Sequence, residues 1–528
     1  MTTAAKLVPE QAKLPKGRST LDKVNNTLTD ELIIGICSPI GSLHEPVIDC
    51  LQKQLNQNYN YDVEIIKISD FILKFYPERL KNEGGKTSGY TELMHKIKGG
   101  DHLRKEYKSN SILIDLAIQK IRMGRGGSDA SDFKSRRKCY IINSLKNRDE
   151  LRLLRIIYRD LFYLFGVFSP EDTRMNHLIN NKHLNKPEAT EIIIKDDHEN
   201  LDHGQNVRET FVESDFFIRN TNLEIDEKLT SKVERYLHLI FKTKIVTPNN
   251  HEIAMFHAKS AAGNSACLSR QVGAAITDEK GTTIARGWND VPKFGGNLYR
   301  DGDEFDNRCK ETGYCSNVKQ RQNIISEISN GLQDSIIKLL KEKNFNLDLS
   351  TINSLKQINV EILKSSRIKS LIEFSRSIHA EMHAIITGSQ LGGDRMIGGS
   401  LYCTTYPCHN CARHIILAGI KKVYYIEPYK KSLCTVLHDD AITEKENEDN
   451  KVKILLYDGV SPRRFLEFFS MNEDVRKDDH GDVKPKKTND AIPFNRLSLR
   501  AIPELENQAV HFLYESKLLN IGDEEESK

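Results

Sequence analysis

The chain has 528 residues, a length that suits two or three domains. Hydrophobic residues make up 38% of it and charged residues 29%, so the chain is polar but can still bury cores. The formal net charge of +3 is too small for the strongly basic surface of a dedicated nucleic-acid binder, although it is compatible with local pockets for phosphate groups.

The sequence shows no sign of a membrane span or of export. No apolar run approaches the length of a transmembrane helix, and the first 20 residues lack the apolar core of a secretory signal. Ten cysteines in such a chain are not expected to form a disulfide framework. We therefore expect a soluble cytoplasmic protein whose thiolates are free to bind metal.

The first half of the chain alternates between strand and helix patterns. A β-branched run within residues 31–42 ends in Gly, Pro and Ser and precedes an amphipathic stretch, which predicts a strand, a turn and a helix. Similar patterns follow, with strands predicted within 61–70, 138–147 and 162–170 and a helix at 147–161. Such alternation predicts a parallel sheet covered by helices.

The second half starts a new pattern at residue 250, with a helix and then a pair of strands within 270–290. Residues 303–360 are rich in Lys and Asn, and we interpret them as an insertion. Helix, strand, helix and strand patterns then follow between residues 377 and 428. We expect four parts: a flexible arm at 1–30, a first α/β domain at 31–240, a second at 241–475 with its insertion at about 303–360, and a linker and C-terminal tail at 476–528.

Two short motifs in the second domain point to a metal site. Cys408 and Cys411 are three residues apart at the start of a predicted helix, so both sulfurs lie on one face and the helix N-terminus favours their thiolate forms. Pro407 precedes that first turn, where its missing N–H costs nothing. His379 can supply a third ligand from the other helix start. Three protein ligands leave a tetrahedral Zn²⁺ with an open fourth position, which is the catalytic arrangement.

Glu381 is placed to act as the base beside that open position. The pattern H-x-E … P-C-x-x-C, here His379-Ala380-Glu381 and Pro407 to Cys411, is associated with zinc-dependent nucleobase deaminases. A C-x-x-C alone fits a redox pair or half of a structural zinc site, and H-x-E alone carries almost no information. The combination of the two favours a deaminase.

The sequence around these motifs resembles the deoxycytidylate deaminases. SRQVGAAITDEKGTTIARGWNDVP (269–292) is similar to the first strands of that family and has Asn289 where the family keeps a sugar-contacting asparagine. LYCTTYPCHNCARHIILAGIKKVYY (401–425) and PYKKSLCTVLHDDAI (428–442) resemble its longer bacterial members, in which a kinase-like domain precedes the deaminase and deoxycytidine nucleotides are depleted during phage infection. CYIINSLKNRDELRLLRIIYRDLFYLFGVFSP and GQNVRETF resemble the first domain of the same proteins, so the likeness covers most of residues 31–470.

This resemblance implies an N-terminal P-loop-kinase-like parallel sheet followed by a cytidine-deaminase-like three-layer α/β/α domain. It also implies zinc-dependent hydrolytic deamination of free deoxycytidine nucleotides, dCMP or dCTP or both, in defence against phage, by an enzyme that forms homo-oligomers. His379, Cys408 and Cys411 would hold the metal, Glu381 would carry protons to N3 and to the departing ammonia, and the Ala380 backbone would meet the base edge.

Other polar residues have an ordinary interpretation beside the functional one. Four cations are candidates for binding phosphates, although such a residue is more often a solvated surface charge: Arg270, Arg286, Lys293 and Arg413. His438 and Asp440 either line the pocket or are ordinary loop residues, and we expect His383 and His409 to be bystanders. A second metal site at Cys309 and Cys315, with His257 or Cys267, is an alternative to the unpaired, structurally ordinary cysteines that we favour.

The loop GICSPIGS in the first domain lies where a phosphate-binding loop would be expected. Gly35, Gly41 and Ser42 resemble the motif G-x-x-x-x-G-K-[ST], but the spacing is one residue longer and the lysine is absent. We expect a kinase-like domain without catalysis, in which Gly35, Ser38, Gly41 and Ser42 are candidate nucleotide contacts. Such a domain would bind a regulatory nucleotide, pack oligomers or meet an inhibitory partner; a plain strand-to-helix turn is the alternative.

Two rival functions remain. A deaminase of tRNA or single-stranded DNA would need a basic groove with aromatic side chains, which the modest charge and the one tryptophan disfavour. A nucleotide-sensing binding module with a structural zinc would have no use for a carboxylate beside an open zinc position, so Glu381 argues against it.

Overall fold

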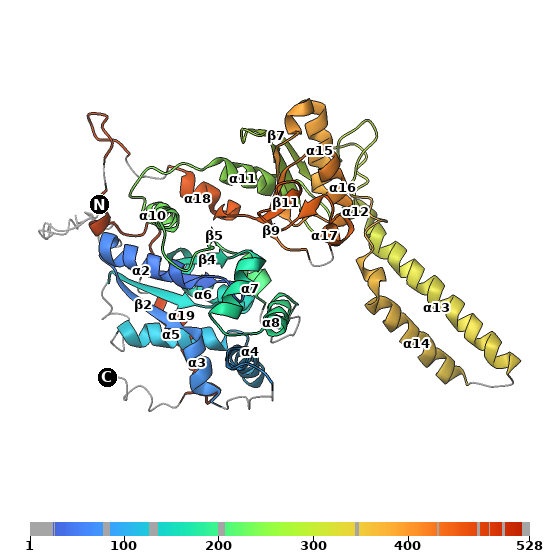
Figure 1. Ribbon diagram of the computed structural model, residues 1–528, viewed down its shortest axis with the longest axis horizontal. Coiled ribbons are helices and arrows are strands. Elements are labelled where there is room, and N and C mark those ends of the chain that lie inside the picture. The colour runs from blue at the N-terminus through green and yellow to red at the C-terminus, as the bar shows by residue number, and fades with distance from the viewer. Residues whose placement is uncertain are drawn as a thin grey trace, which may run out of the picture. The chain divides into compact units, whose positions relative to one another are not determined.

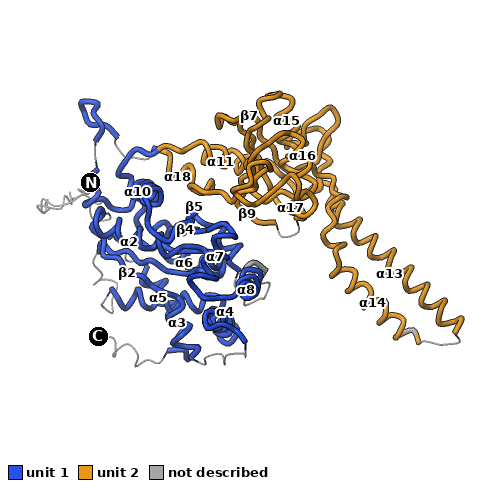
Figure 2. Tube along the Cα trace, viewed as in Figure 1, with its two compact units in different colours: residues 1–246, 471–528 blue, residues 247–470 orange. Residues whose placement is uncertain are grey.

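The computed structural model describes residues 25, 27–77, 85–125, 136–198, 206–343, 348–429, 432–471, 476–484, 486–498 and 502–519. The chain forms two compact units, the first made of residues 1–246 and 471–528 and the second of residues 247–470 (Figure 2). Of the arm expected over residues 1–30, only Asn25 and residues 27–30 are among those described.

A parallel sheet forms the centre of the first unit, as the alternating pattern predicts. Its strands are β1 (Leu32–Cys37), β2 (Asp62–Lys67), β3 (Lys138–Asn143), β4 (Phe162–Phe168) and β5 (Phe216–Arg219). They lie in the order β5-β4-β1-β3-β2, and each neighbouring pair is parallel. Every residue of β1 and β4 is buried, as expected for central strands that are covered by helices on both faces.

The helices of the first unit are α2 (Glu45–Tyr59), α3 (Ile68–Phe75), α4 (Ser88–Glu106), α5 (Ile112–Arg125), α6 (Arg148–Tyr158), α7 (Glu171–Asn180), α8 (Lys186–His198), α9 (Val207–Phe211), α10 (Glu227–Phe241) and α19 (Ile502–Glu515) (Figure 1). A capping box formed by Asn147 and Glu150 fixes the start of α6, close to the predicted boundary. Residues 476–528 are predicted to be a linker before a C-terminal helix or tail. The helix α19 lies there and packs against α5 within the first unit, with Gln119 donating to the Tyr514 hydroxyl at 3.3 Å.

The second unit contains a mixed sheet in the order β10-β11-β9-β8-β6-β7. The strands are β6 (Gly273–Thr277), β7 (Thr283–Trp288), β8 (Ser400–Thr405), β9 (Lys422–Glu427), β10 (Ile442–Thr443) and β11 (Val452–Leu456), and the short β12 (Gly459–Val460) follows them in the chain. β6 is antiparallel to both β7 and β8, whereas β8, β9, β11 and β10 run parallel. The helices are α11 (Asn250–Ala262), α12 (Cys309–Thr312), α13 (Ser316–Glu342), α14 (Leu349–Ser365), α15 (Ala380–Leu391), α16 (His409–Leu417), α17 (Cys434–Leu437) and α18 (Phe465–Phe469).

Two glycines show that helices cover both faces of this sheet. A Cβ on Gly273 would lie 1.9 Å from the carbonyl oxygen of Ala258 in α11, and one on Gly287 would lie 2.3 Å from the backbone nitrogen of Ala384 in α15. Gly287 is paired with Ala274, the neighbour of Gly273, so the two glycines face opposite sides of the sheet. The expected three-layer α/β/α arrangement is confirmed, and its close helix packing requires glycine at both positions.

The insertion expected at about 303–360 contains a long helical hairpin. In Figure 1, α13 and α14 lie side by side and project away from the sheet of the second unit. None of the helices in the described part of the chain is both long and apolar enough to cross a membrane.

Candidate metal centre and catalytic pocket

Two helix starts bring the three predicted metal ligands together. His379 is the residue before α15 and Cys408 the residue before α16, and both have extended backbone. Cys411 lies in the first turn of α16, and its N–H donates to Cys408 Sγ at 3.4 Å. Strand β8 ends three residues before Cys408, so this sulfur lies near the carboxyl end of the strand, and the site forms at that edge of the sheet.

The spacing of the three donor atoms fits a tetrahedral metal ion. His379 Nδ1 lies 3.3 Å from both Cys408 Sγ and Cys411 Sγ. Zn–N and Zn–S bonds at a tetrahedral angle would separate nitrogen from sulfur by roughly 3.6 Å. Both cysteines are buried and His379 is half-buried. One imidazole and two thiols are a donor set that Zn²⁺ prefers, so these residues fit the metal that their sequence spacing predicts.

Contacts within the cluster and burial shift the pKa values of its cysteines and its histidine. The hydrogen bond from Cys411 lowers the pKa of Cys408 to about 4, whereas burial raises the pKa of Cys411 well above its usual value. Burial alone would lower the pKa of His379, but the hydrogen bond with Cys408 raises it to about 9. The pair of sulfurs therefore carries negative charge near neutral pH, which favours a cation between them.

Glu381 is a buried carboxyl group beside this cluster. Its side chain is only 4% exposed, and burial raises its pKa to about 7 despite the opposing effect of His379. A carboxyl group whose pKa lies near neutrality can both accept and return a proton, which is what general acid–base chemistry requires.

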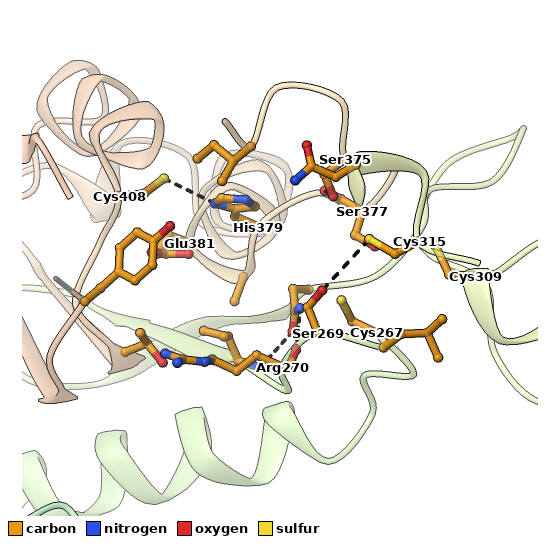
Figure 3. Close-up of a pocket in the computed structure, with 18 of the residues that line it drawn as sticks. Cys267, Ser269, Arg270, Cys309, Cys315, Ser375, Ser377, His379, Glu381 and Cys408 are labelled. Atoms are coloured by element: carbon orange, nitrogen blue, oxygen red, sulfur yellow. Dashed lines mark hydrogen bonds between the residues drawn. The ribbon is translucent and has the colours of Figure 1, made fainter. Parts of the chain in front are cut away.

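A cavity of about 330 Å³ opens in front of the cluster. Figure 3 shows the His379 and Cys408 side chains meeting in its wall, with Glu381 beside them. The volume is at the lower end of the range for small-molecule sites. The arrangement is thus a metal-binding triad with a buried acid, both facing a space large enough for a small ligand.

The structure places both residues predicted to contact substrate at this cavity. Asn289 lines it, but its amide is already engaged: Oδ1 accepts from Val272 N–H at 2.7 Å and Nδ2 donates to the Arg270 carbonyl at 2.8 Å. Ala380 is fully buried at the start of α15, next to the ligand His379.

The four cations considered for phosphate binding lie apart from one another. Arg270 lines the cavity and forms an ion pair with Glu427 at 3.0 Å. Arg286 lines a different cavity, Lys293 pairs with Asp303 at 2.8 Å, and Arg413 is exposed on α16. Arg270 is therefore the one of these four that faces the metal centre. His438 and Asp440 are not among the residues lining this cavity, and His383 lines the other one.

The three additional cysteines line the same cavity but do not form a metal cluster. Cys267, Cys309 and Cys315 lie in its wall, away from the triad (Figure 3), whereas His257 bonds to Thr283 Oγ1 at 3.0 Å. Among the described residues, the only group of three or more His, Cys, Asp or Glu side chains with donor atoms within 4.8 Å of one another is His379, Cys408 and Cys411. All ten cysteines are free.

One wall of the cavity comes from residues that no sequence motif marks. Asn317, in the first turn of α13, lines it together with Ile372 and Ser375, which follow the hairpin. The Asn317 amide donates to the Leu371 carbonyl at 2.9 Å and accepts from the Phe374 N–H at 3.3 Å. The base of the insertion is therefore part of the site, although its residues are far from either motif in the chain.

In the first unit, one of the four candidate nucleotide contacts lies inside a strand and the other three lie in the loop that follows it. Gly35 lies inside β1, where a Cβ would lie 2.5 Å from Leu145, so it makes room for packing in the sheet. Ser38, Gly41 and Ser42 lie in the loop between β1 and α2, and Gly41 has a φ of +82°, which a non-glycine residue rarely adopts.

The second unit is thus an α/β/α domain with a zinc-type triad and a buried acid. Its residues 248–427 match the family model described as the cytidine and deoxycytidylate deaminase zinc-binding region. This part of the chain is a cytidine/deoxycytidylate deaminase family domain.

Several known proteins are similar to this domain. Over 56 residues the chain is 52% identical to ComE operon protein 2 of Bacillus subtilis (strain 168), and the match covers 11% of this chain and 29% of that protein. Over 173 residues it is 28% identical to the deoxycytidylate deaminases of Enterobacteria phages T2 and T4, covering 32% of this chain and 74% and 72% of theirs. A dCMP deaminase structure from cyanophage S-TIM5 is 19% identical, with a TM-score of 0.22, and the match covers 40% of this chain and 100% of that one.

Proposed function

We propose that the protein is a zinc-dependent deaminase of free deoxycytidine nucleotides, converting dCMP, dCTP or both to the deoxyuridine nucleotides. The observation that carries this proposal is the buried carboxyl group of Glu381 beside the His379–Cys408–Cys411 triad, facing a cavity of about 330 Å³. The similar deaminases of phages T2 and T4 support deoxycytidylate as the class of substrate.

In this proposal, His379, Cys408 and Cys411 hold the zinc ion, which when bound acts as a Lewis acid toward a water molecule. Glu381 accepts a proton from the attacking water and delivers it to N3 of the cytosine ring. The same carboxyl group then carries a proton to the amino group that leaves C4 as ammonia. Its pKa of about 7 suits a group that must be protonated and deprotonated in one cycle.

The polar groups of the cavity would orient the nucleotide. The N-terminal turn of α15 would present the Ala380 backbone to the base edge. The Asn289 amide uses one N–H and one acceptor site on backbone partners, so its second N–H and second acceptor site would be left for the sugar. We place the phosphate end toward Arg270, the cation that lines the cavity. Arg270 would then exchange its ion pair with Glu427 for a substrate phosphate.

The biological setting is a further part of the proposal. The likeness of the sequence to the longer bacterial deoxycytidylate deaminases supports a role in depleting dCTP during phage infection. Ten free cysteines support a reducing, cytoplasmic setting. The first unit would then carry a regulatory nucleotide or an inhibitory partner.

We also propose that the chain forms homo-oligomers through the hairpin of α13 and α14. Both helices expose apolar side chains on their outer faces: Ile328, Leu332 and Leu339 on α13, and Ile358 and Ile362 on α14. Val318, Ile325, Leu332 and Leu339 recur every seven residues along α13, a spacing typical of helices that pack against another helix. Both helices carry charges of either sign, with Glu327 and Lys338 on α13 and Lys356 and Glu361 on α14, so a second copy of the hairpin offers complementary charges.

Ammonia release by the zinc-loaded full chain tests the main proposal. The substrates are cytidine, CMP, dCMP, dCTP, a single-stranded DNA and a tRNA, with Glu381→Gln as the reference variant. Activity on dCMP or dCTP that the variant lacks would support it. Activity confined to the DNA or to a tRNA would favour the nucleic-acid deaminase instead, and full biological activity of Glu381→Gln would favour the binding module with a structural zinc.

A further inference from the structure

The loop between β1 and α2 is held by charged side chains from three other elements. Asp196 of α8 accepts the Ile40 N–H through Oδ2 at 2.7 Å. Lys146, which follows β3, donates through Nζ to the Ser38 carbonyl at 2.7 Å, and Arg174 of α7 donates through Nε to the Ile40 carbonyl at 2.7 Å. Two cations and one carboxylate from other elements thus lie at this loop, at the carboxyl end of a central strand.

These three side chains form a buried cluster around the carboxylate. Lys146 Nζ lies 3.7 Å from Asp196 Oδ1, and Arg174 Nη2 lies 3.8 Å from Asp196 Oδ2. The Asp196 side chain is only 1% exposed, and Arg174 is also buried. Two positive charges within 4 Å of one carboxylate leave the cluster with an excess of positive charge.

The hydrogen bonds of the cluster are incomplete. Asp196 Oδ1, Arg174 Nη2 and the buried hydroxyl of Ser42 have no hydrogen-bond partner among the described residues. Buried polar atoms are normally paired, and a buried donor left unpaired destabilises the fold. The Asp196 carboxylate accepts the Ile40 N–H through Oδ2, while Arg174 Nη2 and the Ser42 hydroxyl find no acceptor among the described residues. A tetrahedral anion placed at the loop would offer further acceptor oxygens in other directions.

A phosphate group has the oxygens and the charge that this cluster would accept. The loop lies at a strand-to-helix turn before the 15-residue helix α2, whose N-terminus favours anions. The sequence of the loop lacks the lysine that a phosphate-binding loop needs, but Lys146 supplies an ammonium group at the loop from another element. Ligands of open α/β sheets bind at this kind of place, beyond the carboxyl ends of the central strands.

We propose that loop 38–44, with Lys146 and Arg174, is a phosphate-binding site that Asp196 occupies as an internal substitute for the ligand. A phosphate-bearing ligand and the Asp196 carboxylate compete for the Ile40 N–H and for the two cations. Binding therefore requires α8 to release the loop, so the contact holds the site closed. The ligand class is phosphate, either free pyrophosphate or the phosphate chain of a nucleotide.

Calorimetric titration of the full chain with inorganic pyrophosphate tests the competition. Asp196→Asn should bind pyrophosphate at least tenfold more tightly than the unaltered protein, because it removes the competing charge. Adding Lys146→Met to that variant should abolish the gain. Asp172→Asn, the same change at an exposed position of α7, is the matched control and should leave the affinity unchanged.

The proposal is overturned if Asp196→Asn binds no more tightly than the unaltered protein, or if the gain survives Lys146→Met. A parallel titration with ATP separates the two sources of phosphate. Tighter binding of ATP than of pyrophosphate assigns the site to a nucleotide, and equal binding assigns it to the phosphate groups alone.

A second measurement needs no substitution and so does not depend on a variant folding. Amide hydrogen exchange of the unaltered chain should show faster exchange across α8 at saturating pyrophosphate, because Asp196 must leave the Ile40 N–H. Slower or unchanged exchange of α8 at saturating pyrophosphate would contradict the displacement of Asp196.

Discussion

At the scale of single residues, the proposed function depends on Glu381, a buried carboxyl group beside the His379–Cys408–Cys411 cluster. Replacing it with Gln keeps the shape and removes the group that moves protons. We expect kcat for ammonia release to fall by about 10²–10⁴, the usual contribution of a positioned acid or base. Zinc content, measured by atomic absorption, should not change, because Glu381 is not one of the three ligands.

Glu279→Gln is the matched control, since Glu279 is exposed on the turn between β6 and β7. It should retain full activity. A Glu381→Gln variant that keeps a normal kcat with normal zinc content would show that another group moves the protons.

A second carboxyl group, Asp115 of α5, makes stability depend on pH. Burial raises its pKa to about 7, so between about pH 4 and pH 7 the folded state holds a proton that the unfolded state has lost. Its contribution to the free energy of unfolding therefore falls as pH rises through that range. Asp115→Asn removes this penalty and should stabilise the first unit at pH 8 by on the order of 2–4 kcal/mol.

Urea unfolding at pH 5, 6.5 and 8 checks this prediction. The stability difference between Asp115→Asn and the parent should widen steadily with pH, whereas Asp149→Asn, a change at a half-exposed position on α6, should track the parent. A difference that stays constant with pH would mean that Asp115 keeps an ordinary pKa in the folded protein.

At the scale of elements, helix α19 is tied to α5 through a buried ion cluster. Arg125 donates to Glu31 from Nε and Nη2 at 3.0 and 2.7 Å, and it also pairs with Glu506 of α19. Glu506 in turn accepts from the Tyr158 hydroxyl at 2.7 Å. Removing one partner of such a cluster leaves buried charge uncompensated.

We therefore expect Glu506→Ala to destabilise the first unit by about 3–5 kcal/mol. Thermal unfolding followed by circular dichroism measures the change. Glu504→Ala, an exposed position on the same helix, should cost well under 1 kcal/mol. Equal effects of the two substitutions would show that α19 contributes little to the fold of this unit.

The hairpin of α13 and α14 is the element on which the proposed assembly depends. Leu332 is 44% exposed in the middle of the apolar stripe of α13, so a charge there would oppose helix packing between copies. Leu332→Glu should reduce the assembly to a smaller species in size-exclusion chromatography with light scattering. Asn330→Ala, an exposed change on the same helix that alters no charge, should leave the assembly unchanged. A Leu332→Glu variant of unaltered size would rule out this interface.

At the scale of the whole molecule, the two units should respond differently to metal removal. The three ligands all belong to the second unit, at the starts of α15 and α16. Removing zinc by a chelator should abolish deamination and lower the thermal stability of that unit, because metal binding contributes free energy to folding. Calorimetry should show one transition shifted and a second unchanged, and the shifted transition should return to its original position when zinc is restored. Two transitions that move together would contradict this assignment.

The sequence by itself determined which three residues form the triad and which class of fold holds them. The two cysteines three residues apart and the histidine two before the glutamate are local patterns. At a helix start, residues with such spacing lie on the same side of the helix, so their side chains come close together. The alternating strand and helix patterns of the first half predict its parallel sheet in the same way, because the hydrophobic periodicity of each element is local.

Only the tertiary structure decided which distant residues meet. Lys146, Arg174 and Asp196 follow or belong to different elements, yet they converge on one loop whose own sequence lacks a lysine. Asn317, a residue of the insertion, lines the wall of the candidate cavity. Helix α19 packs on α5, and the paired residues Gln119 and Tyr514 are 395 positions apart in the chain. Such contacts depend on how the layers of helices and strands pack against one another. They cannot be predicted from the spacing of residues along a single element.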